Sequence, residues 1–293
     1  MIEITYKLVS ELFLQPRARN TNKGDFGRVL VLAGSPGMAG AAILCANGAL
    51  RAGAGLVTVS VPSELFPIVQ SSVPEAICVK RPGGAAYDGG DSLNNVLSPE
   101  RLSAYDSIVV GPGLGACYDT WELVMHVLEN FGGKLVLDAD ALNVLAGSNI
   151  TLDRDTVITP HPGEAARLLG VDSQVIQAKR EASAAYLAEK FGCVVALKGS
   201  GTIVAATNPN LKLFMNNTGN PGMATGGSGD VLAGVIAAFL GQGIETQTAA
   251  CAAVYIHGFA GDLMVKEYGE LGLVAGDLPV GIARTLKYIA GTL

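Results

Sequence analysis

Short runs of β-branched residues alternate with longer stretches rich in Ala and Leu from about residue 28 to the C-terminus. The runs predict buried strands over 28–34, 55–62, 106–113, 134–140, 156–160 and 194–199. The stretches between them predict helices over 41–53, 119–131, 163–170 and 179–192. Such alternation is typical of a mostly parallel sheet with helices on both faces, so we expect an α/β fold.

The pattern changes after residue 200. GTIVAAT (201–207) and LKLFMN (211–216) are close enough in the chain to pair as a hairpin. Further helices are expected over 228–243, 246–268 and 277–290. No Pro- or Ser-rich linker, charge block or repeat divides the sequence, so we expect a single domain over residues 1–293. The turn-forming residues of 81–95 predict a mobile insertion.

The charge balance excludes several classes of partner. The formal net charge is −6, whereas a nucleic-acid or anionic membrane surface needs clustered Lys and Arg. The N-terminus, MIEITYKLVSELF, has acidic residues where a signal peptide has a basic start, and no uninterrupted apolar run is long enough to span a bilayer. We therefore expect a cytoplasmic protein without nucleic-acid or membrane partners. Its five scattered cysteines should be reduced thiols, and its three histidines should form no zinc site.

Glycine-rich loops that follow strands are where ligands bind in sheets of this kind. AGSPGMAGAA (33–42) opens a helix and suits a tight connection as well as a binding loop. GPGLGA (111–116) is followed by a helix and by Asp138 at the end of the next strand, which is typical of dinucleotide-binding sites. Because Pro112 and Gly115 add more turns than that fingerprint needs, the loop predicts a phosphate or substrate contact. A nicotinamide dehydrogenase remains an alternative.

Acidic and amide side chains follow two of the predicted strands. TPHPGE (159–164) places His161 at a strand end and Glu164 in the first turn of the next helix, where a carboxylate usually serves the helix dipole. LDADALN (137–143) adds Asp138, Asp140 and Asn143 to the same edge of the sheet. Their oxygen atoms could hold Mg²⁺ through water molecules.

KGSGT (198–202) is the next loop after a predicted strand. It lacks the GxxxxGK[ST] spacing of a Walker A loop. Its lysine could be the solvated end of a strand. The glycines on both sides of Ser200 instead favour a contact with phosphate.

GNPGMATGGSGDVLAG (219–234) is the most specific segment, with six glycines before and around one carboxylate, Asp230. Gly227, Ser228 and Gly229 stand at the start of a predicted helix, where unpaired N–H groups and the helix dipole bind anions. A cap by Ser228 would explain that residue but not the surrounding glycines. A carboxylate beside a phosphate cradle predicts phosphoryl transfer to a hydroxyl group.

These motifs occur together in one known family. GPGLG, LDADALN, TPHPGE, LKGSGT and NTGNPGMATGGSGDVLAG closely resemble segments of the ADP/ATP-dependent NAD(P)H-hydrate dehydratases, a branch of the ribokinase-like superfamily. The resemblance runs from about residue 24 to the C-terminus, and it is to the stand-alone form without an epimerase domain. It implies a ribokinase-like three-layer α/β/α fold. It also implies a lyase that phosphorylates the ring hydroxyl of the S-epimer of NADHX or NADPHX and eliminates phosphate, so that ADP gives AMP.

The resemblance also assigns roles to residues. Asp230 is similar to the base on the hydroxyl, with Gly227, Ser228 and Gly229 as the anion hole. The positions similar to nucleotide-binding residues are Lys198, Gly199, Ser200, Gly201, Thr202 and Gly229. The positions similar to hydrate-binding residues are Ala42, Gly113, Gly115, His161 and Asp230. Glu164 stands where related kinases have a Mg²⁺-associated acid acting through water, although His161 replaces their usual Asn.

The expected cofactor is Mg²⁺ and the expected co-substrate is ADP or ATP. By resemblance we also expect a homo-oligomer, with a tetramer as one form. Two other functions remain open. A ribokinase-like vitamin or sugar kinase would use Asp230 and the same cradle but would leave phosphate on its acceptor. A non-catalytic nucleotide sensor would bind ADP without turnover.

Overall fold

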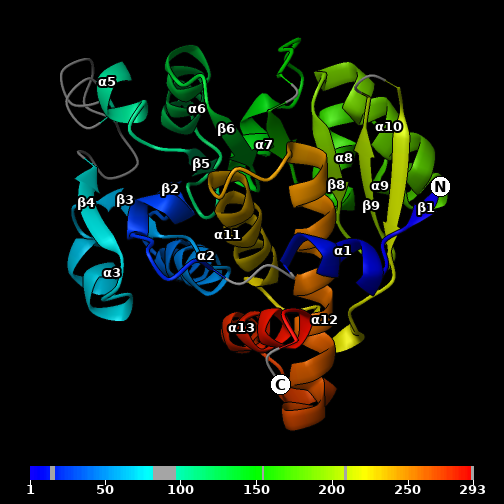
Figure 1. The fold of residues 1–293 in the computed structure, drawn as a ribbon. Coiled ribbons are helices and arrows are strands. Elements are labelled where there is room, and N and C mark those ends of the chain that lie inside the picture. The colour runs from blue at the N-terminus through cyan, green and yellow to red at the C-terminus, as the bar shows by residue number, and fades with distance from the viewer. Residues whose placement is uncertain (14–16, 82–96, 154, 208–209, 292–293) are drawn as a thin grey trace.

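The computed structural model of the protein describes residues 1–13, 17–81, 97–153, 155–207 and 210–291. Its strands form one ten-stranded sheet in the order β1-β10-β9-β8-β7-β6-β5-β2-β3-β4 (Figure 1). They are β1 (Ile2–Glu3), β2 (Arg28–Leu32), β3 (Leu56–Pro62), β4 (Ile77–Arg81), β5 (Ser107–Val110), β6 (Lys134–Leu137), β7 (Thr156–Ile158), β8 (Val194–Leu197), β9 (Thr202–Ala206) and β10 (Lys212–Asn216). The insertion predicted over 81–95 lies outside the described residues, apart from Arg81 at the end of β4.

The sheet is mostly parallel, as predicted. β2 pairs in parallel with β3 and β5, and parallel pairing continues through β6 and β7 to β8. β9 runs antiparallel to both β8 and β10, so the predicted hairpin is confirmed. The sequence pattern missed the two edge strands. β1 has only two residues, and β4 contains Lys80 and Arg81, so neither has the continuous apolar run of a central strand.

Helices cover both faces of the sheet, which confirms the three α/β/α layers (Figure 1). They are α1 (Tyr6–Phe13), α2 (Ala39–Arg51), α3 (Phe66–Ser72), α5 (Pro99–Leu102), α6 (Tyr118–Asn130), α7 (Asp140–Leu145), α8 (Pro162–Leu169), α9 (Ser173–Ala178), α10 (Arg180–Phe191), α11 (Ser228–Gly241), α12 (Thr246–Gly272) and α13 (Leu278–Ile289). Short 3₁₀ helices are η1 (Lys23–Phe26), η2 (Pro221–Met223) and η3 (Ala275–Asp277).

Each face of the sheet has its own apolar core, because successive strand residues point to opposite sides. On β2, Val29 and Val31 join the core that contains α2, α11 and α12, while Leu30 and Leu32 join the core that contains α6, α8 and α10. Both sets are fully or almost fully buried. Burial on two faces explains why the strands read as continuous apolar runs in the sequence.

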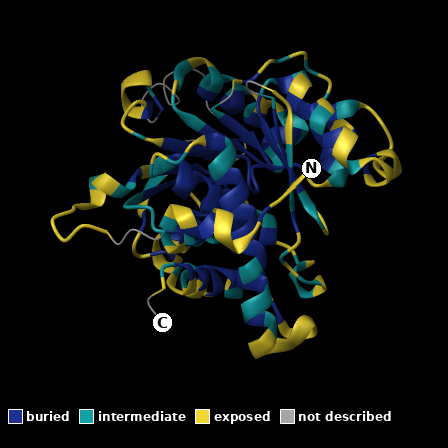
Figure 2. Cartoon of the chain, turned by 45° about the vertical axis from the view of Figure 1, so that its right-hand side comes forward, coloured by how far each residue is buried: buried dark blue, intermediate teal, exposed yellow. Residues whose placement is uncertain are grey.

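α11 lies at the centre of its layer, and most of its residues are buried. Figure 2 shows how burial is distributed over the molecule, with buried residues inside and exposed residues on the outer helices and loops. α11 crosses α2 very closely. A Cβ added at Gly234 would lie 2.0 Å from the carbonyl oxygen of Cys45, and one at Gly48 would lie 2.4 Å from that of Val231. Only glycine permits this approach, which fixes where the first turn of α11 lies.

α12 is the one described helix long and apolar enough to cross a bilayer by length and composition, which the sequence pattern did not predict. However, 72% of its apolar window is buried inside the protein. Its buried residues belong to the same core as α2 and α11. α12 is therefore packed as a core helix in this structure.

Candidate active site

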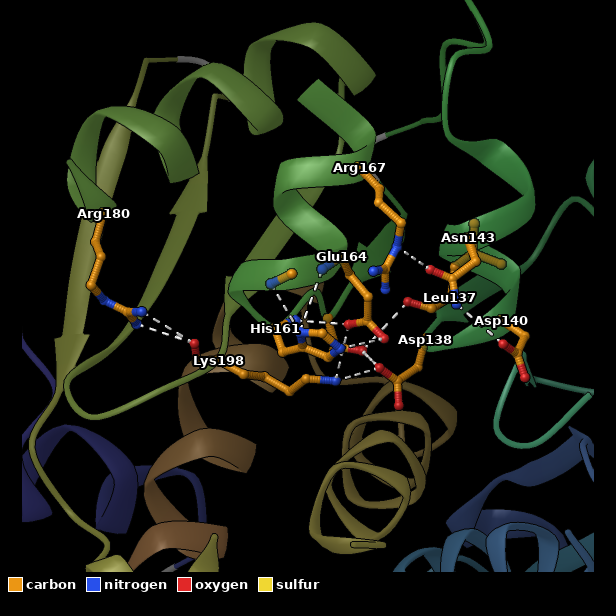
Figure 3. Close-up of polar contacts among 11 residues, drawn as sticks. Leu137, Asp138, Asp140, Asn143, His161, Glu164, Arg167, Arg180 and Lys198 are labelled. Carbon is orange, nitrogen blue, oxygen red and sulfur yellow. Dashed lines mark hydrogen bonds and ion pairs between the residues drawn. The ribbon is translucent and has the colours of Figure 1, made fainter. Parts of the chain in front are cut away.

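Three strands end side by side and place polar side chains at one point of the sheet edge (Figure 3). Asp138 follows β6, Thr159 follows β7 and Lys198 follows β8. Asp138 is 1% exposed, and its Oδ1 accepts hydrogen bonds from Thr159 Oγ1 at 2.7 Å and from Lys198 Nζ at 2.6 Å. A buried carboxylate needs such partners. The ammonium group that the sequence assigned to a nucleotide phosphate is therefore paired with Asp138.

His161 and Glu164 form a capping box at the start of α8. The N–H of His161 donates to Glu164 Oε2 at 2.7 Å, and His161 Nδ1 accepts from the N–H of Gly163 at 3.0 Å. Glu164 Oε1 lies 3.3 Å from His161 Nε2, and its Oε2 also lies 3.7 Å from Lys198 Nζ. Because both carboxylate oxygens have partners, Glu164 does not fit as a direct Mg²⁺ ligand. A contact through water stays a prediction.

The charges of this cluster depend on one another. Burial raises the pKa of Glu164, and nearby Lys198 opposes that rise. Burial alone would lower the pKa of Lys198, but Asp138 and Glu164 raise it above its usual value. Lys198 is thus a firmly protonated cation between two carboxyl groups.

A second group of hydrogen-bonded polar residues begins just after Asp138 in the chain. Ala139 has a φ of 51°, which is unusual for a residue with a side chain, and Asp140 follows it. Asp140 Oδ2 accepts the N–H of Gly115 at 2.8 Å, and Asp140 Oδ1 accepts from Asn143 at 3.1 Å. Arg167 then donates to Asn143 at 2.8 Å. Asp140 and Asn143 therefore hold the GPGLGA loop, and no metal-binding group of three acidic, His or Cys side chains occurs in the described ranges.

The glycine block ends at the start of α11, as predicted. Gly227 is the residue before the helix and has a φ of 96°, a conformation that favours glycine. Ser228 does not cap the helix, because its hydroxyl donates to the carbonyl oxygen of Met223 at 2.9 Å. The first backbone N–H groups of a helix have no acceptor within it. The N–H groups of Gly229 and Asp230 are thus oriented for an anion.

Asp230 lies in the first turn of α11. Burial and, to a smaller extent, nearby Asp138 raise its pKa to about 7, although Lys198 opposes the rise. A carboxylate with a pKa near neutrality is suited to accepting a proton at physiological pH. The geometry therefore agrees with a general base at this position.

A pocket of about 480 Å³ opens beside the start of α11. Its walls come from the KGSGT loop, the segment after β10, the first turn of α11 and one face of α12. The lining residues are Lys198, Gly199, Ser200, Gly201, Thr202, Asn216, Asn217, Thr218, Gly219, Asn220, Pro221, Met223, Ala224, Ser228, Gly229, Leu232, Val254, His257 and Gly258. All residues that the sequence assigned to the nucleotide line this one pocket, whose volume is in the range of small-molecule sites.

Arg180 of α10 holds the KGSGT loop from behind (Figure 3). Its guanidinium donates to the carbonyl oxygens of Leu197 at 3.0 Å, Lys198 at 3.3 Å and Gly201 at 3.3 Å. Gly199 has a φ of 140°, and a Cβ added there would lie 2.8 Å from Arg180 Nη1. The loop shape thus depends on a glycine at 199.

Gly199→Val is expected to weaken ADP binding by tenfold or more, since the side chain displaces Arg180 and deforms the loop that lines the pocket. Calorimetric titration with ADP measures the effect. Gly147→Val serves as a control, because Gly147 also has a positive φ, 79°, but nothing lies within 4 Å of an added Cβ. Equal ADP affinity in wild type and Gly199→Val would contradict the role of the loop.

The predicted hydrate-binding residues are less well grouped. Gly115 is partly exposed and has open space beside it, and the side chain of His161 is half exposed. Ala42 is fully buried, and Gly113 is buried against Ala41 and Met38. Ala42 and Gly113 support the loops at the ends of β2 and β5 and are buried in the protein, not open to a ligand in this conformation.

The dinucleotide fingerprint is not supported as a hydride-transfer site. In that fingerprint, the acid after the second strand binds a ribose hydroxyl. Asp138 is buried and bonded to Thr159 and Lys198, so it cannot serve this purpose. GPGLGA instead belongs to the edge that Asp140 holds.

Sequence reasoning assigned no role to one wall of the pocket. Asn216 is the last residue of β10, Asn220 lies in the segment after it, and His257 lies on α12. His257 Nε2 donates to the carbonyl oxygen of Ser228 at 2.9 Å, and burial lowers the pKa of His257 to about 4, so the ring is neutral. The closely spaced Asn and Gly residues of NTGN (217–220) were a sequence signal for Asn220. No local pattern distinguishes His257.

The sheet order, the helix start beside Asp230 and the adjoining pocket define a ribokinase-like α/β protein. The chain belongs to the NAD(P)H-hydrate dehydratase family, which matches residues 29–283. It is similar to the solved ADP/ATP-dependent NAD(P)H-hydrate dehydratase of Bacillus subtilis, co-crystallised with ATP/Mg²⁺, with a TM-score of 0.83 and 30% identity over 98% of each chain.

Two curated relatives differ in length. The bifunctional NAD(P)H-hydrate repair enzyme of Moorella thermoacetica is 43% identical over 90% of this chain, which spans 50% of that protein. The ADP-dependent (S)-NAD(P)H-hydrate dehydratase of Neisseria meningitidis is 36% identical over 89% of this chain and 86% of its own length. The chain therefore corresponds to about half of the bifunctional relative and to most of the shorter one.

Proposed function

We propose that this protein is a hydro-lyase that dehydrates the S-epimer of NADHX and NADPHX to NADH and NADPH, with conversion of ADP to AMP and phosphate. The observation that carries this proposal is the position of Asp230, a carboxylate of near-neutral pKa in the first turn of α11 beside the pocket. The relative from Neisseria meningitidis, named for this activity, supports it.

In the proposed reaction, Asp230 takes the proton of the ring hydroxyl while the hydroxyl oxygen attacks the terminal phosphorus of the nucleotide. The bond from phosphorus to the bridging oxygen breaks, and AMP keeps that electron pair. The backbone N–H groups of Gly229 and Asp230 stabilise the phosphoryl oxygens. The ring C–O bond then breaks with the pair on phosphate. A neighbouring ring carbon loses a proton to solvent water, and the electron pair of that C–H bond forms the ring double bond.

Mg²⁺ is proposed to arrive with the nucleotide phosphates, whose charge it neutralises, as is usual for this ion. Glu164, with both oxygens bonded, would approach it only through water. The Bacillus subtilis relative was co-crystallised with ATP/Mg²⁺, which supports the pairing of the ion with a nucleotide. For the nucleotide itself we propose that ADP is used in preference to ATP.

The decisive experiment incubates purified protein with chemically hydrated NADPH, Mg²⁺ and either ADP or ATP. Reduced-nicotinamide absorbance should return only when a nucleotide is present, with one free phosphate released per cofactor restored. Turnover without nucleotide would refute the proposal. Phosphate that stays on an acceptor would favour a vitamin or sugar kinase, and tight ADP binding without turnover would favour a nucleotide sensor.

The proposed location of the enzyme is the cytoplasm. All five cysteines are free, and Cys45, Cys193 and Cys251 are buried. Such thiols suit a reducing compartment. We also propose a homo-oligomer, whose state light scattering of the purified protein would measure.

A further inference from the structure

We infer that Asp262 of α12 is a positioning residue that holds the nucleotide-side wall of the pocket in its binding shape; the inference rests on the proposed function. The wall is the segment 216–223, which begins at the last residue of β10 and most of which lines the pocket. Asp262 itself is not among the lining residues. It acts through two residues that are, Gly219 and Asn220.

The contacts of Asp262 are directed at the centre of this wall. Asp262 Oδ2 accepts the backbone N–H of Gly219 at 2.9 Å, and Asp262 Oδ1 accepts from Asn220 Nδ2 at 3.0 Å. Asn220 Oδ1 in turn accepts the N–H of Gly222 at 3.1 Å and caps η2. Hydrogen bonds to an ionised acceptor are stronger than those between neutral groups. One carboxylate thus fixes both the backbone and a side chain of the wall.

The face of α12 around Asp262 is shaped to receive the same segment. Gly258 and Asp262 are four residues apart, and Gly261 lies beside them, so they share one region of the helix surface. A Cβ added at Gly258 would lie 2.3 Å from Thr218 Oγ1, and one at Gly261 would lie 2.2 Å from Met223 Sδ. The absent side chains allow the wall to lie directly on the helix, within reach of the carboxylate.

The wall is also connected to the proposed catalytic helix start. η2 ends at Met223, and the carbonyl oxygen of Met223 accepts the hydroxyl of Ser228 in the first turn of α11. Loss of the Asp262 contacts therefore frees a segment that carries pocket-lining residues. Because GPGLGA is held by Asp140 and not by this wall, the binding of hydrated NADPH should be affected much less than the binding of ADP.

The test exchanges the carboxylate of Asp262 and the amide of Asn220, first one at a time and then together. In Asp262→Asn, the new amide can still accept from Gly219 but faces the amide of Asn220, donor against donor. Asn220 cannot turn over without losing its bond to Gly222. In Asn220→Asp, two carboxylates face each other. Each single variant should raise the Kd and KM for ADP about tenfold, with little change in the KM for hydrated NADPH.

The double variant Asp262→Asn with Asn220→Asp restores one donor and one acceptor, so it should recover most of the ADP affinity. Asp106→Asn is the matched control, since Asp106 Oδ2 also accepts a distant backbone N–H, that of Arg28, at 2.7 Å but lies outside the pocket lining. A loss of stability without a specific effect on ADP would appear in melting temperature and in both KM values.

Calorimetry measures the affinity of each variant for ADP, so it tests the role of Asp262 independently of turnover. Wild-type ADP affinity in both single variants, or no recovery in the double variant, would overturn it. If wild-type protein binds ADP but restores no NADPH, the proposed function fails while the exchange still tests Asp262. If a single variant does not fold, Asn220→Ala removes the same side-chain contact from the loop side and should raise the Kd for ADP similarly.

Discussion

Asp230→Asn is expected to lower turnover of hydrated NADPH by about 10²- to 10⁴-fold, the usual effect of losing a general base. The amide has the same shape and can accept a hydrogen bond, but it cannot take the proton of the ring hydroxyl. ADP affinity should persist or rise slightly, because backbone N–H groups hold the phosphates and a negative charge near them is removed. Turnover assays and ADP calorimetry on the one variant measure both effects.

The pH dependence of the same variant gives a second readout. With the pKa of Asp230 raised to about 7, wild-type turnover should increase as pH rises through about 7, and that limb should vanish in Asp230→Asn. A carboxyl whose folded pKa exceeds its ordinary 3.8 loses folded stability as pH rises between those values. Asp230→Asn should therefore melt at a higher temperature than wild type at pH 8, and less so at pH 4.

Glu181→Gln is a matched control for this prediction. Glu181 is an exposed acid in the first turn of α10, outside the pocket lining. It should lose at most about 1 kcal/mol of helix-dipole stabilisation and keep full turnover. Near-normal turnover in Asp230→Asn would show that Asp230, like Glu181, is only a helix-dipole partner, and would end its catalytic assignment.

The sequence predicted the layers and central strands because their signal is local. A strand buried on both faces, such as β2 or β5, must be continuously apolar, and the glycines before α11 are dense enough to mark a backbone that approaches a ligand. The edge strand β1 has no such signal. Its two residues pair with β10, which lies more than two hundred residues away, and this pairing is decided by tertiary contacts.

The partners of side chains were less predictable than their positions. Lys198 and Asp138 both belong to recognisable motifs, but sixty residues separate them, and only the neighbouring positions of β6, β7 and β8 bring them together. For the same reason Asp262 carried no signal, since its contacts lie forty-three and forty-two residues back along the chain. A motif identifies a loop, whereas the sheet order decides which charge faces it.

Lys198→Ala is therefore expected to act first on stability. Removing the ammonium leaves the carboxylate of Asp138, which is 1% exposed, with Thr159 as its one side-chain hydrogen-bond partner among the described residues. It also takes a cation from Glu164. Breaking a buried pair in this way costs about 3–5 kcal/mol. The free energy of unfolding in urea measures it. Arg284→Ala, which breaks the exposed pair with Glu267, should lower the free energy of unfolding far less, because solvent screens exposed ion pairs.

Asp138→Asn added to Lys198→Ala separates the two roles that Lys198 could have. If the main role of Lys198 is to neutralise Asp138, removing the second charge should recover much of the lost unfolding free energy, because no uncompensated carboxylate stays buried there. The loss of ADP-binding free energy, measured under conditions where each variant is folded, should then be smaller than the loss of unfolding free energy. Unchanged stability in Lys198→Ala together with a large loss of ADP affinity would show the opposite, that the ammonium leaves Asp138 to bind the nucleotide phosphates.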